Sequence, residues 1–529
     1  MKLLPNLHFT GLLIALFACI TGYLVFWGEG QVFWAGYASM LAFYVVTFYM
    51  GAQSRKETDD QSVEEVMLAG RNMPLVLAIF TMAATWIDGG YINGSAEYAA
   101  NKAYGLIWVQ APWGYALSLV IGGLFFAKRM RSREYKTMLD PLDERFGKRI
   151  TAVLFVPALL GEIFWTATIL TALGMTFGVV TGMGATASIL ICSITCIGYA
   201  ALGGIRAIAV TDVLLISSIV VGLLVVLFFA LPQVGGLELA WSDYQSKMGA
   251  AASFLPDKAY LGTSWWSWWD SALLLIFGGI PWQVYFQRVL SAKTPQVAQN
   301  LSILGGVVCI LVAIPAVLIG VVGFELTELN KWAELGASQT PQPTEIAPYV
   351  MRYAVPTLAA ILGLGAIASA VMSSVAASVL SAASMGVWNV IVPFRSKETS
   401  PEHLSNYLKI STIVIGVLAT FLSLKVQSVY ALWVLCSDFV YCFLFPALVC
   451  ALFIERVKGK HVILGLIVAF VLRFGGGDAS LGLPQILPYP TDVNGLILVP
   501  YKSIAMVSSL LIMVLSSFLR LKENHKPNL

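Results

Sequence analysis

The stretch "TWIDGGYING", residues 85–94, interrupts an apolar run that would otherwise read as one membrane-spanning helix. Hydrocarbon cannot satisfy the backbone groups that such an interruption exposes. Breaks of this kind persist where the exposed carbonyls and amides line a protein cavity or contact a bound group. The stretch therefore indicates a helix that is opened inside the membrane, with its carbonyls and helix ends facing a cation.

A second interruption, "GGIP" at residues 278–281, lies in a later apolar run. Apolar windows of about 20 residues predict about fourteen spans, near 9–28, 32–52, 73–100, 104–127, 150–181, 186–203, 209–231, 266–286, 299–325, 346–386, 408–424, 428–453, 460–473 and 499–520. The two breaks fall in the third and eighth windows, which open two successive sets of five. Paired breaks at matching positions point to an inverted-repeat transporter with its site near the midplane. Either break alone is explained equally well by glycines that pack helices closely.

The composition excludes a soluble fold. Of 529 residues, 58% are hydrophobic and 12% are charged, and the mean hydropathy is +0.80. We therefore predict an all-α integral membrane protein, and the paired breaks predict an inverted-repeat core made of two sets of five spans. Its expected parts are two N-terminal helices with a cytoplasmic loop (1–72), the transport core (73–453), and C-terminal helices with a short tail (454–529).

The distribution of basic residues predicts the orientation. With the N-terminus inside, most of the 32 Lys and Arg residues fall in inward-facing segments, which resist translocation. Arg288 is among the residues assigned to these inner segments. We expect both termini in the cytoplasm of a multi-pass cell-membrane protein. The compact tails and the lack of a glycosylation context suggest a bacterial inner membrane.

Several aromatic side chains lie unusually deep in the predicted spans: Trp86, Tyr115, Trp165, Trp282 and Trp433. A quaternary ammonium group has no N–H donor and is held by aromatic ring faces, at ~0.5–2 kcal/mol per contact. These rings predict a cage for such a ligand. Core packing explains each ring taken singly just as well.

A run of small and hydroxyl residues, "GAIASAVMSSVAAS" at 365–378, offers oxygen ligands. Ser373 and Ser374, together with carbonyls exposed at the breaks, suit a hard cation such as Na⁺. Close helix packing is the competing explanation for such a run.

Four acids are expected inside the membrane, where each is energetically costly. Asp88 either contributes a negative charge for a cation or the substrate, or caps the second half of its broken helix. Glu162 and Asp438 lie close in sequence to Trp165 and Trp433, so they are expected to orient the cage or face a water-filled path. Asp270 is expected to cap its own helix near the interface.

Other functional classes find little support. The seven cysteines and four histidines do not form a metal-ligand pattern, and no basic face indicates nucleic-acid binding. No nucleophile and base pair, phosphate loop or metal cluster suggests an enzyme. A sensor built on a transporter fold would normally carry a signalling domain, and only a short tail follows the last predicted span. The expected partners are a small substrate, Na⁺ as coupling ion and membrane lipid, with no organic cofactor and an undetermined oligomeric state.

Several motifs resemble, in order, the high-affinity choline transporters of the sodium:solute symporter family. They are "TWIDGGYINGSAE", "APWGYALSL", "GGLFFAKRMRS", "TMLDP", "GEIFW", "GGIPWQVYFQRVL" and "SAVMSSV". The stretch "GGIRAIAVTD", residues 203–212, resembles the broader symporter signature, with Leu215 in place of its usual following glutamine. The resemblance runs from about residue 33 to 521. It implies a five-plus-five inverted-repeat, leucine-transporter-like core and Na⁺-driven uptake of choline or a closely similar quaternary amine by alternating access. A symporter of another small amine, amino acid or betaine, coupled to sodium or protons, remains the alternative.

The resemblance also implies site residues. The family's sodium site corresponds to carbonyls of Ala84, Ile87 and Ala370 and hydroxyls of Ser373 and Ser374. The choline pocket corresponds to the five deep aromatic residues given above, with Asp88 beside them.

The chain departs from the family at three places. Its first predicted helix precedes the span at which family members begin. Asp88 replaces a common glycine, and Ala376 replaces a common aspartate two residues after the serine pair.

Overall fold

The computed structural model describes residues 4–27, 32–56, 67–202, 205–395, 401–425, 428–478, 482–493 and 495–519. Every regular element in these ranges is helical, and β pairing is limited to isolated bridges such as Met73–Ala292. The N-terminal and C-terminal tips, which are predicted to lie in the cytoplasm, are outside the described residues.

The helices follow the predicted apolar windows. In the first part of the chain they are α1 (Leu4–Trp27), α2 (Trp34–Lys56), α4 (Leu75–Trp86), α5 (Gly89–Ala100), α6 (Ala111–Ile121), the π-helical turn η3 (Gly122–Ala127), α7 (Lys128–Ser132), α8 (Asp140–Phe146), α9 (Lys148–Thr181), α10 (Ala185–Leu202), α11 (Ile205–Ala230), α12 (Leu237–Met248) and α13 (Lys258–Leu261). The second part contains α14 (Trp265–Gly278), α15 (Gln283–Ser291), α16 (Pro295–Glu328), α17 (Ile346–Tyr353), α18 (Thr357–Met385), α19 (Pro401–Ser423), α20 (Val429–Phe439), η10 (Val440–Leu444), α21 (Phe445–Phe453), α22 (Gly459–Gly475) and α23 (Tyr501–Ser516).

The protein is a helical membrane protein with many spans. Among the described residues, eight helices are long and apolar enough to cross a membrane, or nine if the bent pair α4–α5 forms one span. This is fewer than the predicted number of about fourteen. The described apolar parts of α1, α2, α10 and α23 are shorter than a full span. The window at 346–386 divides into α17 and α18, and α17 is largely buried.

The first break has a local explanation. α4 ends at Trp86 and α5 begins at Gly89, with an angle of 51° between the two helices. Asp88 caps α5, since its side chain accepts the backbone N–H of Tyr91 at 2.6 Å. A Cβ at position 89 would lie 2.3 Å from Val371 Cγ2 of α18. Glycine is therefore required for α5 to begin this close to α18.

The second break lies between α14 and α15, at residues 279–282. Pro281 lacks an amide donor and cannot continue the hydrogen bonding of a helix interior, and Trp282 is extended at the cap of α15. A Cβ at Gly279 would lie 2.5 Å from the Ser118 hydroxyl oxygen. As at the first break, glycine permits close approach to a neighbouring helix.

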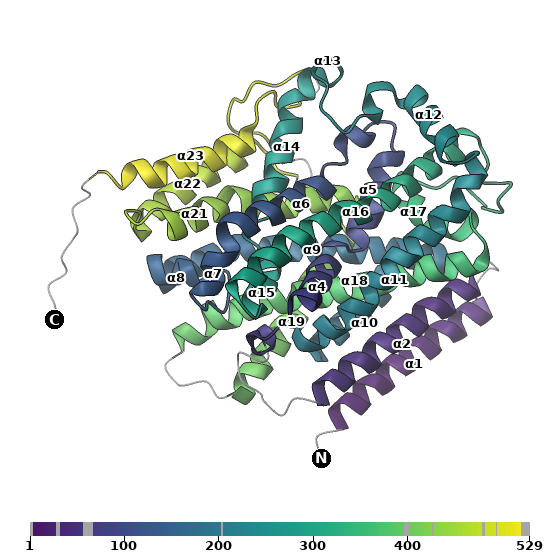
Figure 1. Cartoon of the computed structure of the whole chain (residues 1–529), viewed down its shortest axis with the longest axis horizontal. Coiled ribbons are helices and arrows are strands. Elements are labelled where there is room, and N and C mark those ends of the chain that lie inside the picture. The colour runs from purple at the N-terminus through teal and green to yellow at the C-terminus, as the bar shows by residue number, and fades with distance from the viewer. Residues whose placement is uncertain are drawn as a thin grey trace.

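The helices pack in two groups around the breaks. α16 packs against α4, α5 and α6, whereas α9 packs against α10, α18, α19 and α20. α9 packs closely against α20, and α18 packs closely against α11. The terminal pairs α1–α2 and α22–α23 lie at opposite edges of the molecule (Figure 1). Both broken helices pass through the region between these edges.

Candidate functional site

Four aromatic rings meet at the two breaks. The ring of Trp86, which ends α4, lies 4.8 Å from Tyr115, 6.0 Å from Trp165 and 6.4 Å from Trp282 between ring centroids. Trp165 and Trp282 are 5.6 Å apart and nearly perpendicular. Trp433 of α20 joins through Tyr115, at 5.3 Å. All five rings are buried, so the structure brings the predicted cage residues into one cluster.

Hydrogen bonds fix three of these side chains. The indole N–H of Trp165 donates to Asp88 Oδ2 at 2.9 Å, and that of Trp282 donates to the carbonyl of Gly278 at 2.6 Å. The hydroxyl of Tyr115 bonds to the hydroxyl of Ser437 on α20. The Trp86 Nε1 is buried and has no hydrogen-bond partner among the described residues. Trp86 therefore offers an unused donor within the aromatic cluster.

Both carboxylate oxygens of Asp88 accept a hydrogen bond. Oδ1 accepts the amide of Tyr91 and Oδ2 accepts the indole of Trp165. The side chain is 1% exposed, so its charge lies inside the protein beside the cluster. Asp88 thus caps α5, which was one of the two roles considered from the sequence. It also holds the Trp165 ring, which neither role included.

The residues predicted for sodium face one another across α4 and α18. Ala84 and Ile87 lie at the C-terminal end of α4, where the last carbonyls lack helical partners. The Ser374 hydroxyl of α18 donates to the Ala84 carbonyl at 3.3 Å. Ala370 lies one turn before it on the same helix, and both are buried. These oxygens form a donor set of the hard kind that Na⁺ prefers.

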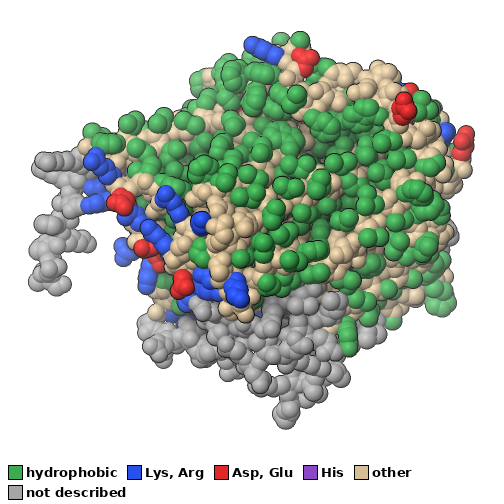
Figure 2. Space-filling view, viewed as in Figure 1, with side chains coloured by type: hydrophobic (Ala, Val, Ile, Leu, Met, Phe, Trp, Pro, Cys, Tyr) green, Lys and Arg blue, Asp and Glu red, His purple; other side chains and the backbone are tan. Residues whose placement is uncertain are grey.

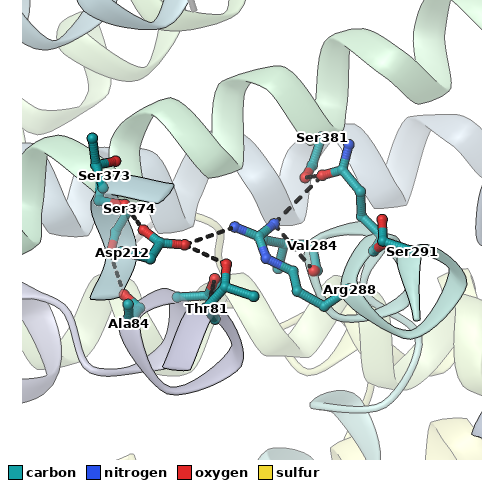
Figure 3. A network of polar contacts seen from close by, with 12 residues as sticks. Thr81, Ala84, Asp212, Val284, Arg288, Ser291, Ser373, Ser374 and Ser381 are labelled. Atoms are coloured by element: carbon teal, nitrogen blue, oxygen red, sulfur yellow. Dashed lines mark hydrogen bonds and ion pairs between the residues drawn. The ribbon is translucent and has the colours of Figure 1, made fainter. Parts of the chain in front are cut away.

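An acid that sequence reasoning missed lies beside this set. Asp212 of α11 is fully buried and accepts hydrogen bonds from Ser373 and from Thr81 of α4. Because the Ser373 hydroxyl donates its proton to Asp212, its oxygen lone pairs stay available to a cation. Figure 3 shows Asp212 between the two serines and Arg288. The signal was present, since Asp212 ends the quoted motif "GGIRAIAVTD".

Arg288 is the charge that balances Asp212. Its Nη2 lies 4.0 Å from Asp212 Oδ2, and the side chain is fully buried in α15. The Nε and Nη2 atoms have no hydrogen-bond partner among the described residues. Arg288, which the charge count placed in an inner loop segment, thus lies buried within α15. Charge counting treats every Lys or Arg near a predicted helix end as a loop residue, whereas α15 continues past Arg288 inside the protein.

Two further buried acids have other hydrogen-bond partners, although Glu162 also interacts electrostatically with Arg288. Glu162 accepts the Ser378 hydroxyl at 2.7 Å, and its Oε1 lacks a hydrogen-bond partner among the described residues. Asp438 pairs with Arg473 and, at 3.3 Å, with Lys502. It directly follows Ser437, the partner of Tyr115.

Asp270 also differs from expectation. It accepts the backbone amides of Lys502 and Ser503 at 3.0 and 2.7 Å. These amides lie in the first turn of α23. Asp270 therefore caps α23 rather than its own helix.

Comparison with known proteins decides the family. The model of the sodium:solute symporter family matches residues 66–469. The chain belongs to the sodium:solute symporter family. This symporter is 41% identical to high-affinity choline transporter 1 of Caenorhabditis elegans, over 90% of this chain and 83% of the relative. It is 39% identical to high affinity choline transporter 1 of Homo sapiens, over 92% of this chain and 85% of the relative.

Solved structures support the fold of the symporter. A Na⁺-coupled sialic acid symporter in a substrate-bound outward-open state matches with a TM-score of 0.76 at 17% identity, covering 91% of this chain and 97% of that one. The nucleobase-cation symporter Mhp1, in a closed conformation, matches with a TM-score of 0.54 at 14% identity, covering 86% and 94%. The family model and the choline transporter relatives show that the symporter is a transporter rather than an enzyme.

Proposed function

We propose that the chain imports choline or a closely similar quaternary amine, driven by Na⁺, through alternating access. The observation that carries the proposal is the aromatic cluster at the meeting of two broken helices, in a chain about 40% identical to choline transporters. A methylated ammonium group is bound by aromatic faces and needs no acceptor. Trp86, Tyr115, Trp165, Trp282 and Trp433 would form the walls of its pocket.

Asp88 would act on a quaternary amine through its charge, because such an ammonium has no N–H to donate. Each Asp88 oxygen already accepts one protein N–H. The carboxylate still attracts a cation through its charge, which acts over several ångströms in a buried site. Asp88 would thus add electrostatic attraction without directly bonding the substrate nitrogen.

The unused Trp86 donor supports recognition of the choline hydroxyl. Its N–H is buried with no partner among the described residues, and a buried donor left unpaired costs ~1–3 kcal/mol. A substrate oxygen placed beside it would remove this cost. Trp86 would therefore contact the ammonium through its ring and the hydroxyl oxygen through its N–H.

Sodium would bind between α4 and α18. Its ligands would be the carbonyls of Ala84, Ile87 and Ala370 and the hydroxyls of Ser373 and Ser374. The buried carboxylate of Asp212, bonded to Ser373, would supply negative charge next to the ion. Trp86 follows Ala84 by two residues at the end of α4. Sodium binding at this helix end would therefore fix the position of the Trp86 ring, which provides a physical basis for coupling.

The arrangement of helices supports a five-plus-five repeat over 73–453. The set α4/α5, α6, α9, α10, α11 would correspond to α14/α15, α16, α18, α19, α20/α21, and the matched pairings α9–α20 and α18–α11 agree with this assignment. The helices before residue 73 and after 453 would lie outside the repeat, giving about fourteen spans with both termini in the cytoplasm. A bacterial inner membrane would be the expected location.

The aromatic rings touch one another, so substrate would enter as they separate. Movement of the group around α16 relative to the group around α9 would open the cluster to one side of the membrane and then the other.

Equilibrium binding of choline to the purified protein tests the proposed pocket. Replacing Trp86 or Trp282 by alanine should raise the choline Kd by about tenfold or more, because each removes a ring contact and leaves a gap. Trp266→Ala is the matched control, since Trp266 is 49% exposed. Unchanged affinity in both pocket variants would reject the aromatic site.

A further inference from the structure

A basic groove lies between α7 and α21, at one edge of the apolar surface of the protein (Figure 2). It has a volume of about 430 Å³ and is lined by Lys128, Arg129, Ser132 and Arg133 of the α7 region and by Leu452 of α21. Figure 2 shows Lys and Arg side chains gathered beside the apolar surface, on the side where Figure 1 places α7 and α8. Three of its five lining residues are positively charged, and the groove is open to the surroundings.

The helix leading into the groove changes from apolar to basic along a single face. Leu124 and Phe125 of η3 are 52% and 57% exposed, and the exposed Lys128 and Arg129 follow each of them by four residues. Residues four apart share a helix face. The apolar pair would contact lipid chains, so the basic pair lies at the depth of the headgroups.

Within the described residues, the positive charge of Lys128 and Arg129 has no acidic ion-pair partner. Arg129 donates to the Leu452 carbonyl at 3.2 Å and lies 4.3 Å over the ring of Phe453. These contacts hold the guanidinium in place and leave other N–H groups for an external acceptor.

Nearby acids act on other groups. Glu144 lies 3.7 Å from Arg133 and accepts the Tyr135 hydroxyl, and Glu134 lies 3.8 Å from Arg131. Arg133 is therefore compensated, and the groove keeps the charges of Lys128 and Arg129.

We propose that this groove binds the phosphate of an anionic phospholipid, with Lys128 and Arg129 as its ligands and Leu124 and Phe125 along its acyl chains. Basic pockets between helices at a membrane edge select anionic headgroups through charge. The continuity of the apolar and basic halves fits a lipid rather than a small soluble anion. The proposal is independent of the transported substrate.

Native mass spectrometry of the full chain with added phosphatidylglycerol or phosphatidylcholine tests this site. Wild type should retain phosphatidylglycerol preferentially. The double variant Lys128→Gln/Arg129→Gln should bind it about tenfold more weakly, because each basic residue near the surface contributes to the attraction. Lys128→Arg/Arg129→Lys keeps both charges and should restore binding.

The matched control is Lys148→Gln/Arg149→Gln. It removes two exposed charges at the start of α9 that do not line the groove. This variant should bind phosphatidylglycerol as wild type does. Equal loss in both double variants would reject a specific site in favour of general surface charge. Displacement of the lipid by an equal concentration of glycerol phosphate would also overturn the proposal, because the apolar half would then contribute nothing. Choline binding should be unchanged in both double variants. This result would show that the variants are folded.

Discussion

The indole N–H of Trp165 donates to the carboxylate of Asp88 across 2.9 Å, and this bond joins α9 to the break between α4 and α5. The other Asp88 oxygen accepts the amide of Tyr91. One side chain thus shapes a helix end and orients an aromatic ring.

Replacing Asp88 by asparagine should weaken choline binding by about tenfold, because asparagine has one acceptor oxygen where the structure uses two. Its amide nitrogen would face either the Trp165 or the Tyr91 N–H. Titration of choline against the purified variant measures the effect. The half-saturating Na⁺ concentration should stay close to the wild-type value, since Asp212 is the acid beside the sodium ligands. A changed Na⁺ dependence with unaltered choline affinity would assign Asp88 to the ion instead.

The Trp86 N–H should discriminate between choline and ethyltrimethylammonium, which lacks the hydroxyl. In Trp86→Phe the preference for choline should fall by about fivefold, the value of one neutral hydrogen bond. Competition binding with both ligands measures the ratio of affinities. Trp282→Phe is the control, because the Trp282 N–H is already bonded to Gly278, and it should keep the wild-type ratio. A lost preference in both variants, or in neither, would remove the proposed contact.

Ser374→Ala should raise the half-saturating Na⁺ concentration several-fold, by removing one oxygen ligand at the end of α4. Uptake or binding measured over a series of Na⁺ concentrations gives this value. Ser384 provides the control, because it is buried on the same helix and its hydroxyl has no partner among the described residues. Should Ser384→Ala shift the Na⁺ dependence as strongly, a general effect on α18 would explain both results.

Asp212→Asn should reduce both stability and sodium affinity. Removing the acid deprives the buried Arg288 of its ion-pair partner, a loss that costs about 3–5 kcal/mol for a buried pair. The double variant Asp212→Asn/Arg288→Gln should recover much of the thermal stability but not the Na⁺ affinity. Thermal unfolding and Na⁺ titration separate the two effects. Wild-type Na⁺ affinity in the double variant would show that Asp212 acts only as a partner of Arg288.

The sequence was informative where a residue type conflicted with its surroundings. Glycines, proline and aspartate within apolar runs indicated both breaks, and tryptophans far from the helix ends indicated the cluster. These features are local, so they can be recognised in one sequence. The family assignment also followed from ordered motifs and is confirmed by the family model and the relatives.

The missed features depend on three-dimensional proximity. Asp212 and Arg288 are 76 positions apart in the chain, yet they pair inside the protein. Arg288 lies near the end of a predicted span and was treated as a loop residue. The link between Asp88 and Trp165 likewise joins two helices whose relative rotation no periodic pattern specifies. Sequence patterns thus located the elements and several site residues, while the partners of buried charges required the structure.

Accumulation of labelled choline in proteoliposomes tests the central claim most directly. With an inward Na⁺ gradient, wild-type protein should concentrate choline above its external level, and replacing the gradient by K⁺ should abolish accumulation. Trp282→Ala should reduce the initial rate at low choline. Equal uptake in Na⁺ and K⁺, or choline binding without accumulation under an intact Na⁺ gradient, would contradict sodium-driven choline import.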